Sequence, residues 1–193
     1  MDEKISQMIS DKIFKKERVF VKKGKVVLMT GLSGSGKSTL ATKLKEYLEK
    51  ESKRVRIVDG DEIRTKFNPH LGFTKEDIRT NGEFIKKFCE ANITEYDYIF
   101  VPVIFPFEKS RESMRALFGE NFIEIYLDCS LECCRQKDVK DIYKKFYERE
   151  ITNLIGADPN IPYEIPSTPD LSINTEEMSE EECFEKIKEK LEI

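Results

Sequence analysis

The sequence predicts a three-layer α/β/α fold, in which helices cover both faces of a mostly parallel sheet. Short apolar runs alternate along the chain with longer segments of helical periodicity, an alternation that is typical of parallel sheets. The runs are rich in β-branched residues and show no polar alternation, as expected of strands buried on both faces. With 193 residues, the chain has the length of one domain with a full hydrophobic core.

The N-terminal part of the chain predicts a helix, a strand and a second helix. Residues 1–24 alternate charged and apolar side chains, so we expect a short amphipathic helix that precedes the main domain of residues 25–193. Residues 25–30 form a short apolar run that ends at a glycine, which predicts a buried strand. Leucines then recur every four positions, which predicts a helix over residues 38–50.

The rest of the chain continues the alternation. Further strands are predicted at residues 55–58, 99–104 and 123–127, and further helices at residues 74–90, 108–118 and 179–191. The segment 131–150 is a charged helical region. Residues 156–171 hold four of the seven prolines and are expected to be largely loop.

Composition excludes several classes of protein. Lys and Arg number 33 against 37 Asp and Glu, and a net charge of −4 is too acidic for a protein coated by duplex nucleic acid, so no DNA or RNA partner is expected. The longest apolar run is far shorter than the roughly 20 residues of a membrane helix, and no secretory signal is visible. Five cysteines without paired spacing, beside one histidine, are typical of reduced thiols rather than of a zinc site. We expect a cytoplasmic protein with no membrane partner.

The strongest motif is the run GLSGSGKS at residues 31–38, which matches G-x-x-x-x-G-K-[ST] between a predicted strand and a predicted helix. In such a P-loop the glycines let the backbone fold round phosphates, so that its amides point at them. Lys37 would reach the β- and γ-phosphates and Ser38 would coordinate Mg²⁺, so ATP and Mg²⁺ are the expected cofactors. The residues expected to bind the nucleotide are Gly31, Ser33, Gly34, Ser35, Gly36, Lys37, Ser38 and Thr39.

Two carboxylates, Asp59 and Asp61, follow the second predicted strand. They lie at the carboxyl edge of a parallel sheet, where open α/β folds bind ligands. One carboxylate is suited to orient or deprotonate an acceptor hydroxyl, and the other to support the Mg²⁺ shell. No D-x-x-G element with an N-K-x-D guanine reader is found, which argues against a GTPase. The pattern favours a P-loop kinase, with a solvated acidic turn as the alternative for the two carboxylates.

Several further motifs resemble the adenylylsulfate (APS) kinases. They are TGLSGSGKST at residues 30–39, DGDEIR at 59–64, NPHLGFTKED at 68–77, DVKDIYKK at 138–145 and PYE at 162–164. They follow the family's order and spacing from about Lys25 to the C-terminus. The resemblance implies transfer of the γ-phosphoryl group of MgATP to the 3′-hydroxyl of adenylylsulfate, which yields PAPS.

The resemblance also implies roles for individual residues. Asp61 is the implied catalytic carboxylate, with Asp59 assisting it, and Lys37 shares the charge that develops on the transferred group. Ser38 and Asp59 are the implied Mg²⁺ ligands.

Acceptor binding and closure involve other segments. Arg64 is implied to meet the anionic group of the acceptor, Phe73 to stack on its base, and Asn81 to contact it. Residues 131–150 are the implied mobile lid, from which Lys140 brings positive charge over the phosphates and Arg135 contacts the nucleotide.

The chain departs from the family pattern at the acceptor end. The arginine usual three positions before Asn81 is replaced by Ile78, with Arg79 beside it as a substitute contact. The serine of the family's I-S-P element is replaced by Phe105, next to Ile104 at the expected acceptor wall. Loss of that arginine removes a charge-assisted contact of about 1.5–3 kcal/mol unless Arg79 substitutes for it.

These departures leave alternatives open. One is a kinase of the same fold that acts on another nucleotide, such as cytidine diphosphoramidate. A second is a regulatory protein that binds ATP without transferring phosphate, although the intact carboxylates argue against it. The resemblance also raises a homodimer as one option for assembly.

Overall fold

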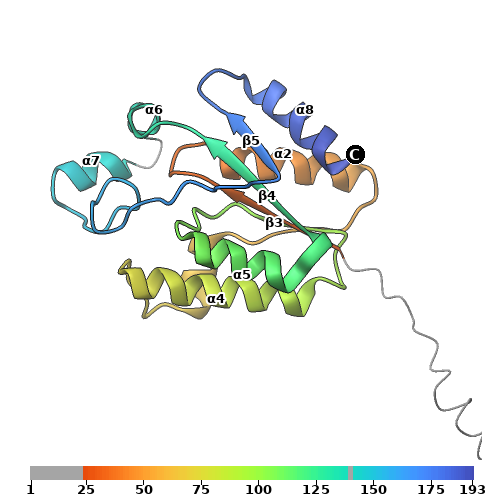
Figure 1. Ribbon diagram of the computed structural model, residues 1–193, viewed down its shortest axis with the longest axis horizontal. Coiled ribbons are helices and arrows are strands. Elements are labelled where there is room, and N and C mark those ends of the chain that lie inside the picture. Colours follow the sequence, from red (N-terminus) through yellow and green to blue (C-terminus); the bar gives the residue numbers. More distant parts are fainter. Residues whose placement is uncertain (1–23, 139–140) are drawn as a thin grey trace, which may run out of the picture.

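The computed structural model describes residues 24–138 and 141–193, which form a five-stranded parallel sheet between two layers of helices (Figure 1). The predicted helix over residues 1–24, except for Gly24, and Lys140 lie outside the described residues. The strands are β1 (Lys25–Thr30), β2 (Val55–Ile57), β3 (Tyr98–Val101), β4 (Phe122–Asp128) and β5 (Leu171–Asn174). Their spatial order is β2-β3-β1-β4-β5, so that the strand before the P-loop is central.

Helices cover both faces of this sheet, which confirms the predicted three-layer architecture. The helices are α2 (Lys37–Lys50), α3 (Gly60–Phe67), α4 (Lys75–Asn92), α5 (Glu108–Phe118), α6 (Leu131–Lys137), α7 (Ile142–Tyr147) and α8 (Glu180–Leu191), with a 3₁₀ turn at Gly119–Asn121. Helices α2 and α8 pack on one face, and α4 and α5 on the other (Figure 1). Successive β1 residues point to opposite faces, so Val27 joins the α2/α8 core and Leu28 the α4/α5 core.

Two elements were not predicted. Helix α3 has only eight residues, and it begins where the Asp59 carboxylate accepts hydrogen bonds from the amides of Asp61 (2.8 Å) and Glu62 (3.0 Å). The carboxylate pair is therefore part of a helix start as well as a candidate site. Strand β5 is short, lies at the sheet edge beside β4, and directly follows the proline-rich segment, which conceals it in the sequence.

Two predicted boundaries also change. The strand predicted to reach residue 104 ends at Val101, because Pro102 has no amide to donate to a neighbouring strand. The region 131–150 contains two short helices rather than one. Asp138 separates them, and its carboxylate accepts from the amides of Tyr143 (3.1 Å) and Lys144 (2.9 Å) in the first turn of α7. None of the helices in the described part of the chain combines the length and the hydrophobicity needed to cross a lipid bilayer.

Candidate functional site

A cavity of about 850 Å³ opens at the carboxyl edge of the sheet. The P-loop contributes one wall, the turn after β2 and the start of α3 a second, and the segment 102–106 after β3 a third. Helix α4 and the segment between α7 and β5 complete it. Since parallel strands end at one edge, segments that are distant in sequence meet here, as expected for a ligand site in an open α/β fold.

The P-loop has the backbone geometry of an anion site. Gly31 has a φ of +145°, and an added Cβ would lie 2.5 Å from the carbonyl oxygen of Leu127, so a larger residue cannot occupy this position. Helix α2 then begins without a side-chain cap and without an acidic residue in its first turn. The amides at this helix start and the positive end of the helix dipole therefore suit the phosphates of a nucleotide.

Lys37 is held against this loop. Its side chain is buried, and Nζ donates to the carbonyl oxygens of Gly31 (2.9 Å) and Leu32 (2.6 Å). The ammonium group is thus positioned beside the loop amides that would surround a phosphate. A buried cation that lines the cavity fits the predicted role of a phosphate contact.

The predicted Mg²⁺ ligands line the same cavity. Ser38 is exposed at the start of α2, and Asp59 caps α3 through one carboxylate oxygen, Oδ1. Hydroxyl and carboxylate oxygens are the donors that Mg²⁺ prefers, so these residues fit the ion. Asp61 lies two residues further on, is exposed, and also lines the cavity. The structure therefore brings both carboxylates next to the P-loop.

Arg64 and Phe73 form one wall of the acceptor end. The Arg64 guanidinium lies 4.5 Å from the centre of the Phe73 ring and donates to the carbonyl oxygen of Gly72. Burial lowers the pKa of Arg64, while the nearby carboxylates of Asp61 and Asp77 oppose this shift. Phe73 remains 49% exposed, with its ring available at the cavity. A flat aromatic side chain beside a cation suits a base and its anionic group.

Helix α4 also contributes to the cavity lining. Asn81 is buried, and its Oδ1 accepts a hydrogen bond from Nδ2 of Asn68 at 3.2 Å. Its side-chain carboxamide is the polar group among the α4 residues that line the cavity. Ile78 lies one turn earlier, where it lines the cavity and packs with Phe107 and Ile161. The wall is therefore apolar at the position where the family pattern has an arginine.

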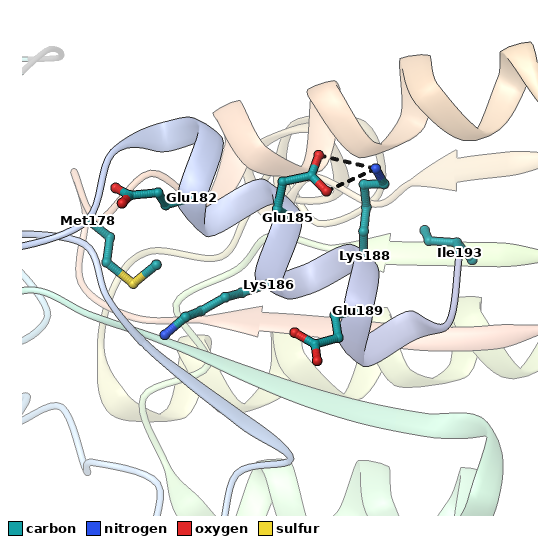
Figure 2. A pocket seen from close by; sticks show the side chains of 7 residues that line it. All are labelled: Met178, Glu182, Glu185, Lys186, Lys188, Glu189 and Ile193. Atoms are coloured by element: carbon teal, nitrogen blue, oxygen red, sulfur yellow. Dashed lines mark hydrogen bonds and ion pairs between the residues drawn. The ribbon is translucent and has the colours of Figure 1, made fainter.

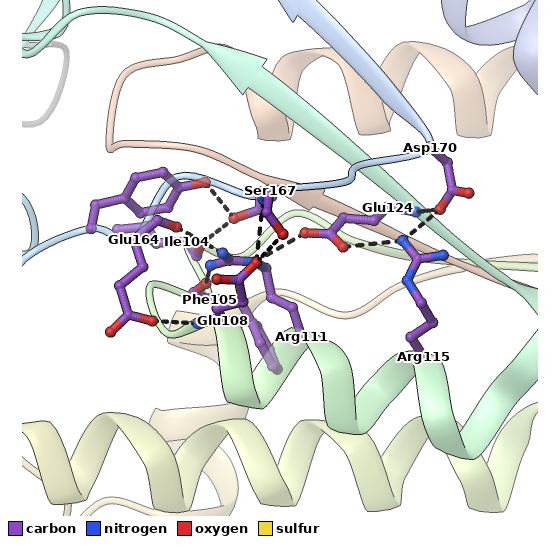
Figure 3. A network of polar contacts seen from close by, with 11 residues as sticks. Ile104, Phe105, Glu108, Arg111, Arg115, Glu124, Glu164, Ser167 and Asp170 are labelled. Carbon is purple, nitrogen blue, oxygen red and sulfur yellow. Dashed lines mark hydrogen bonds and ion pairs between the residues drawn. The ribbon is translucent and has the colours of Figure 1, made fainter.

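Phe105 completes the apolar wall in an unusual backbone conformation. It has a φ of +46°, which is rare for a bulky residue, and its buried ring packs over Gly82 of α4. Arg111 secures this segment by donating to the carbonyl oxygens of Phe105 (2.8 Å) and Glu164 (2.7 Å) (Figure 3).

An ion-pair network continues from Arg111 beneath the cavity wall. The Nε of Arg111 lies 2.9 Å from Oε1 of Glu124, in an ion pair that lacks hydrogen-bond alignment. Arg115 bridges the other oxygen of Glu124 (3.2 Å) to Asp170 (2.8 Å) (Figure 3). Burial raises the pKa of Glu124, and the two arginines oppose this shift. The strained segment at Phe105 thus rests on a buried charged network.

We expect Arg111→Met to lower the free energy of unfolding by about 3–5 kcal/mol, because it leaves the buried Glu124 carboxylate without its nearest cation. Denaturant unfolding followed by circular dichroism measures the change. Lys109→Met, at an exposed position of the same helix, is the matched control. Adding Glu124→Leu to Arg111→Met should recover part of the loss. A single variant as stable as the unaltered chain would contradict the assigned role of the network.

Not every predicted site residue lines the cavity. Gly31 and Ser35 belong to the P-loop but are buried and do not line the cavity. Arg79 points its guanidinium at the ring of Phe107 (4.8 Å), and Arg135 pairs with Glu132 (3.1 Å) on the exposed side of α6. Neither Arg79 nor Arg135 is among the residues that line the cavity, so their predicted contacts stay predictions, while Lys140 lies outside the described residues.

Sequence reasoning missed several lining residues in the second half of the chain. Tyr143 of α7 is fully buried, and its hydroxyl donates to the carbonyl oxygen of Ser33 at 2.9 Å, which ties the lid region to the P-loop. Asn153 and Leu154 follow α7 and face the same space. Tyr143 lies within the DVKDIYKK motif at residues 138–145, but nothing in that motif identifies a partner more than a hundred residues away.

A second hollow, of about 510 Å³, lies over α8 (Figure 2). Its charged side chains include Lys188, which contacts both carboxylate oxygens of Glu185 at 3.1 Å on the same helix. No residue predicted for the site lines it. The hollow is an exposed helix face whose charged side chains form local ion pairs.

Comparison with known proteins agrees with this geometry. Residues 23–174 match the family model described as adenylylsulphate kinase. The adenylyl-sulfate kinase of Clostridium kluyveri is 38% identical over 176 residues, which cover 89% of this chain and 85% of that protein. The structure of the Mycobacterium tuberculosis APS kinase CysC in complex with AMPPNP and APS superposes with a TM-score of 0.82 at 31% identity, and covers 89% of this chain and 99% of that one.

A hexameric APS kinase from Thiobacillus denitrificans is also similar, with a TM-score of 0.64 at 26% identity. The match covers 94% of this chain and 31% of that one. The similarity thus extends over most of the present chain in each case.

Proposed function

Because the chain belongs to the adenylylsulphate kinase family, we propose that it transfers the γ-phosphoryl group of ATP to the 3′-hydroxyl of adenylylsulfate. One observation carries the proposal: the P-loop, the two carboxylates and the Arg64–Phe73 pair open on a single cavity. A phosphoryl donor and a nucleotide acceptor can therefore meet within one cavity. The similar M. tuberculosis structure is a complex with AMPPNP and APS.

Separate residues bind the phosphates, hold Mg²⁺ and act on the acceptor hydroxyl. Lys37 and the first amides of α2 bind the phosphates and stabilise the charge that grows on the transferred group. Ser38 and Asp59 would hold Mg²⁺, which neutralises phosphate charge when bound. Asp61 accepts or orients the proton of the acceptor hydroxyl, since it lines the cavity without serving as the helix cap.

The acceptor end supplies recognition. Phe73 offers a face on which the base stacks, and Arg64 places a cation next to it for the anionic group. Asn81 adds a polar contact from α4. Tyr143 anchors the lid region at Ser33, so closure over the P-loop would exclude water and suppress hydrolysis of ATP.

A coupled assay of ADP release tests the reaction. We expect turnover with MgATP and adenylylsulfate, formation of PAPS as the product, and no turnover with plain nucleoside monophosphates. Chelation of Mg²⁺ should abolish the signal. If ADP release with adenylylsulfate stays at the rate of ATP hydrolysis alone, the proposed acceptor is wrong.

One observation favours a second acceptor. Ile78 and Phe105 make the cavity wall apolar where the family pattern has an arginine and a serine, so an acceptor that carries a different group from the sulfate anhydride is the alternative. Cytidine diphosphoramidate therefore forms a further arm of the same assay. Turnover of this compound in place of adenylylsulfate would establish the alternative, and ATP binding without any turnover would support a regulatory protein.

We expect Phe73→Ala to raise the KM for the acceptor by about 5- to 150-fold, because base stacking on an aromatic ring contributes about 1–3 kcal/mol. The KM for ATP should stay close to its original value. Initial rates at varied acceptor and saturating ATP measure the change. Phe67→Ala is the matched control, since Phe67 is 50% exposed and does not line the cavity. An equal rise in the KM for the acceptor and the KM for ATP would contradict the role given to Phe73.

A homodimer and a cytoplasmic location stay predictions. Light scattering of the purified chain measures the mass in solution and tests the first. Fractionation of cells that express the natural chain tests the second.

A further inference from the structure

Three cysteines and a glutamate gather at the carboxyl end of β4, outside the nucleotide cavity. Cys129 directly follows the strand, and Cys133 and Cys134 lie in the first turn of α6. Glu176 comes from the segment between β5 and α8. The Sγ atoms of Cys129 and Cys133 and a carboxylate oxygen of Glu176 all lie within 4.8 Å of one another.

We propose that Cys129, Cys133 and Glu176 form a binding site for a thiophilic divalent cation such as Zn²⁺. Thiolate and carboxylate groups are the ligands that Zn²⁺ accepts, at about 2.3 Å for sulfur and about 2.0–2.2 Å for oxygen. Two ligands of a tetrahedral site are thus separated by somewhat less than 4 Å, so small side-chain movements would complete the present arrangement. A water molecule would supply the fourth position.

The surrounding groups hold these ligands in place. The amide of Ser130 donates to the Glu176 carboxylate, and the Ser130 hydroxyl accepts from the amide of Cys133 at 3.1 Å. One residue thus orients two of the three ligands through separate bonds. Outer hydrogen bonds of this kind contribute strongly to the affinity of metal sites.

Lys137 is the cation that faces the cluster. Its Nζ lies 3.9 Å from Sγ of Cys129 and 3.4 Å from the carbonyl oxygen of Thr175. An ammonium group beside a thiol favours the thiolate, which is the form that binds metal. With two thiolates and one carboxylate against one lysine, the charge at the site stays negative when the thiols ionise. Because thiols bind metal as thiolates, binding should release protons and weaken as the pH falls.

The site would connect two regions that the nucleotide site uses. Cys134, next to the ligand Cys133, packs against the P-loop closely enough that an added Cβ on Gly34 would lie 3.2 Å from its carbonyl oxygen. Helix α6 is also the first part of the lid region, residues 131–150. A cation bound by Cys133 and Glu176 would therefore fasten α6 to the β5–α8 segment, beside the phosphate loop.

Titration of the full chain with Co²⁺, after reduction with a phosphine, tests the site. We expect one Co²⁺ per chain, with the thiolate charge-transfer and visible absorption of a tetrahedral sulfur-containing site, and displacement by Zn²⁺. Cys133→Ser and Glu176→Gln should each weaken binding at least about tenfold. Cys89→Ala, a buried cysteine of α4, and Glu177→Gln, the exposed neighbour of Glu176, are matched controls that should bind as the unaltered chain does.

The outcomes separate the site from alternatives. Circular dichroism of each variant establishes that it is folded before the titration is interpreted. Absence of a tetrahedral cobalt spectrum, or an unchanged spectrum in Cys133→Ser, would overturn the proposal. Formation of a Cys129–Cys133 disulfide with peroxide, in a chain that binds no Co²⁺, would also overturn it and assign the pair to thiol oxidation. None of these readouts depends on kinase activity.

Discussion

Replacement of Lys37 by alanine should lower kcat/KM for phosphoryl transfer by about 10²–10³-fold. The side chain is the buried cation of the P-loop, where its ammonium group contacts the carbonyl oxygens of Gly31 and Leu32. Loss of one preorganised group that stabilises transition-state charge costs about this much in other enzymes. Initial rates of ADP release with the preferred acceptor measure the effect.

Two further variants make this result specific. Lys45→Ala removes a lysine from the same helix, where it pairs with Glu49 at 3.7 Å on the surface, and should leave the rate unchanged. Lys37→Arg keeps the charge but replaces the compact ammonium group by a larger, planar guanidinium group, so only partial activity is expected. Full activity in Lys37→Ala would overturn the assignment of the P-loop as the phosphate site.

Asp61→Asn should lower kcat by about 10²–10⁴-fold, the usual contribution of general acid–base catalysis, with little change in affinity for ATP. The amide is nearly isosteric with the carboxylate but cannot accept a proton from the acceptor hydroxyl. Rates at saturating substrates give kcat, and fluorescence titration with a labelled ATP analogue gives the affinity. Equal losses in kcat and in the affinity for the ATP analogue would mean that Asp61 binds the nucleotide rather than acting on the acceptor.

The neighbouring carboxylates provide the controls for this experiment. Glu62→Gln alters a residue of the same helix that pairs with Lys66 at 2.8 Å and should leave kcat almost unchanged. Asp59→Asn keeps a good helix cap, because asparagine also accepts from the first-turn amides, while it removes the proposed Mg²⁺ ligand. We expect a higher Mg²⁺ requirement in that variant, and not the loss of acceptor activation expected for Asp61→Asn.

The nucleotide end of the site was predictable because its parts are close together in the sequence. A strand, a glycine loop and a helix occupy residues 25–50 without interruption, and the resulting backbone shape depends on local residue types. Gly31 illustrates the reason: its φ of +145° and the nearby carbonyl oxygen of Leu127 require a glycine. Asp59 and Asp61 were predicted for a similar reason, since they follow the next strand directly.

The acceptor end could be predicted only in part. Arg64, Phe73 and Asn81 belong to motifs, and the structure does bring them to one cavity. Arg79 instead packs against Phe107, because α4 turns it away from the cavity while Ile78 faces it. Adjacent helical residues point in directions about 100° apart, and this rotation decides which of the two side chains faces the cavity. The motif alone does not show which one does.

The sequence by itself determined the layered fold, the phosphate loop and the family resemblance, because each depends on local pattern or on contiguous motifs. Tertiary structure decided which separated residues meet. It joined Tyr143 to Ser33, placed the Phe105 segment on the buried Arg111–Glu124 pair, and brought Glu176 to Cys129 and Cys133. Ser33, Phe105, Cys129 and Glu176 follow the ends of β1, β3, β4 and β5 at one edge of the sheet, whereas Glu124 lies within β4. The separation of these residues along the chain does not show which of them meet.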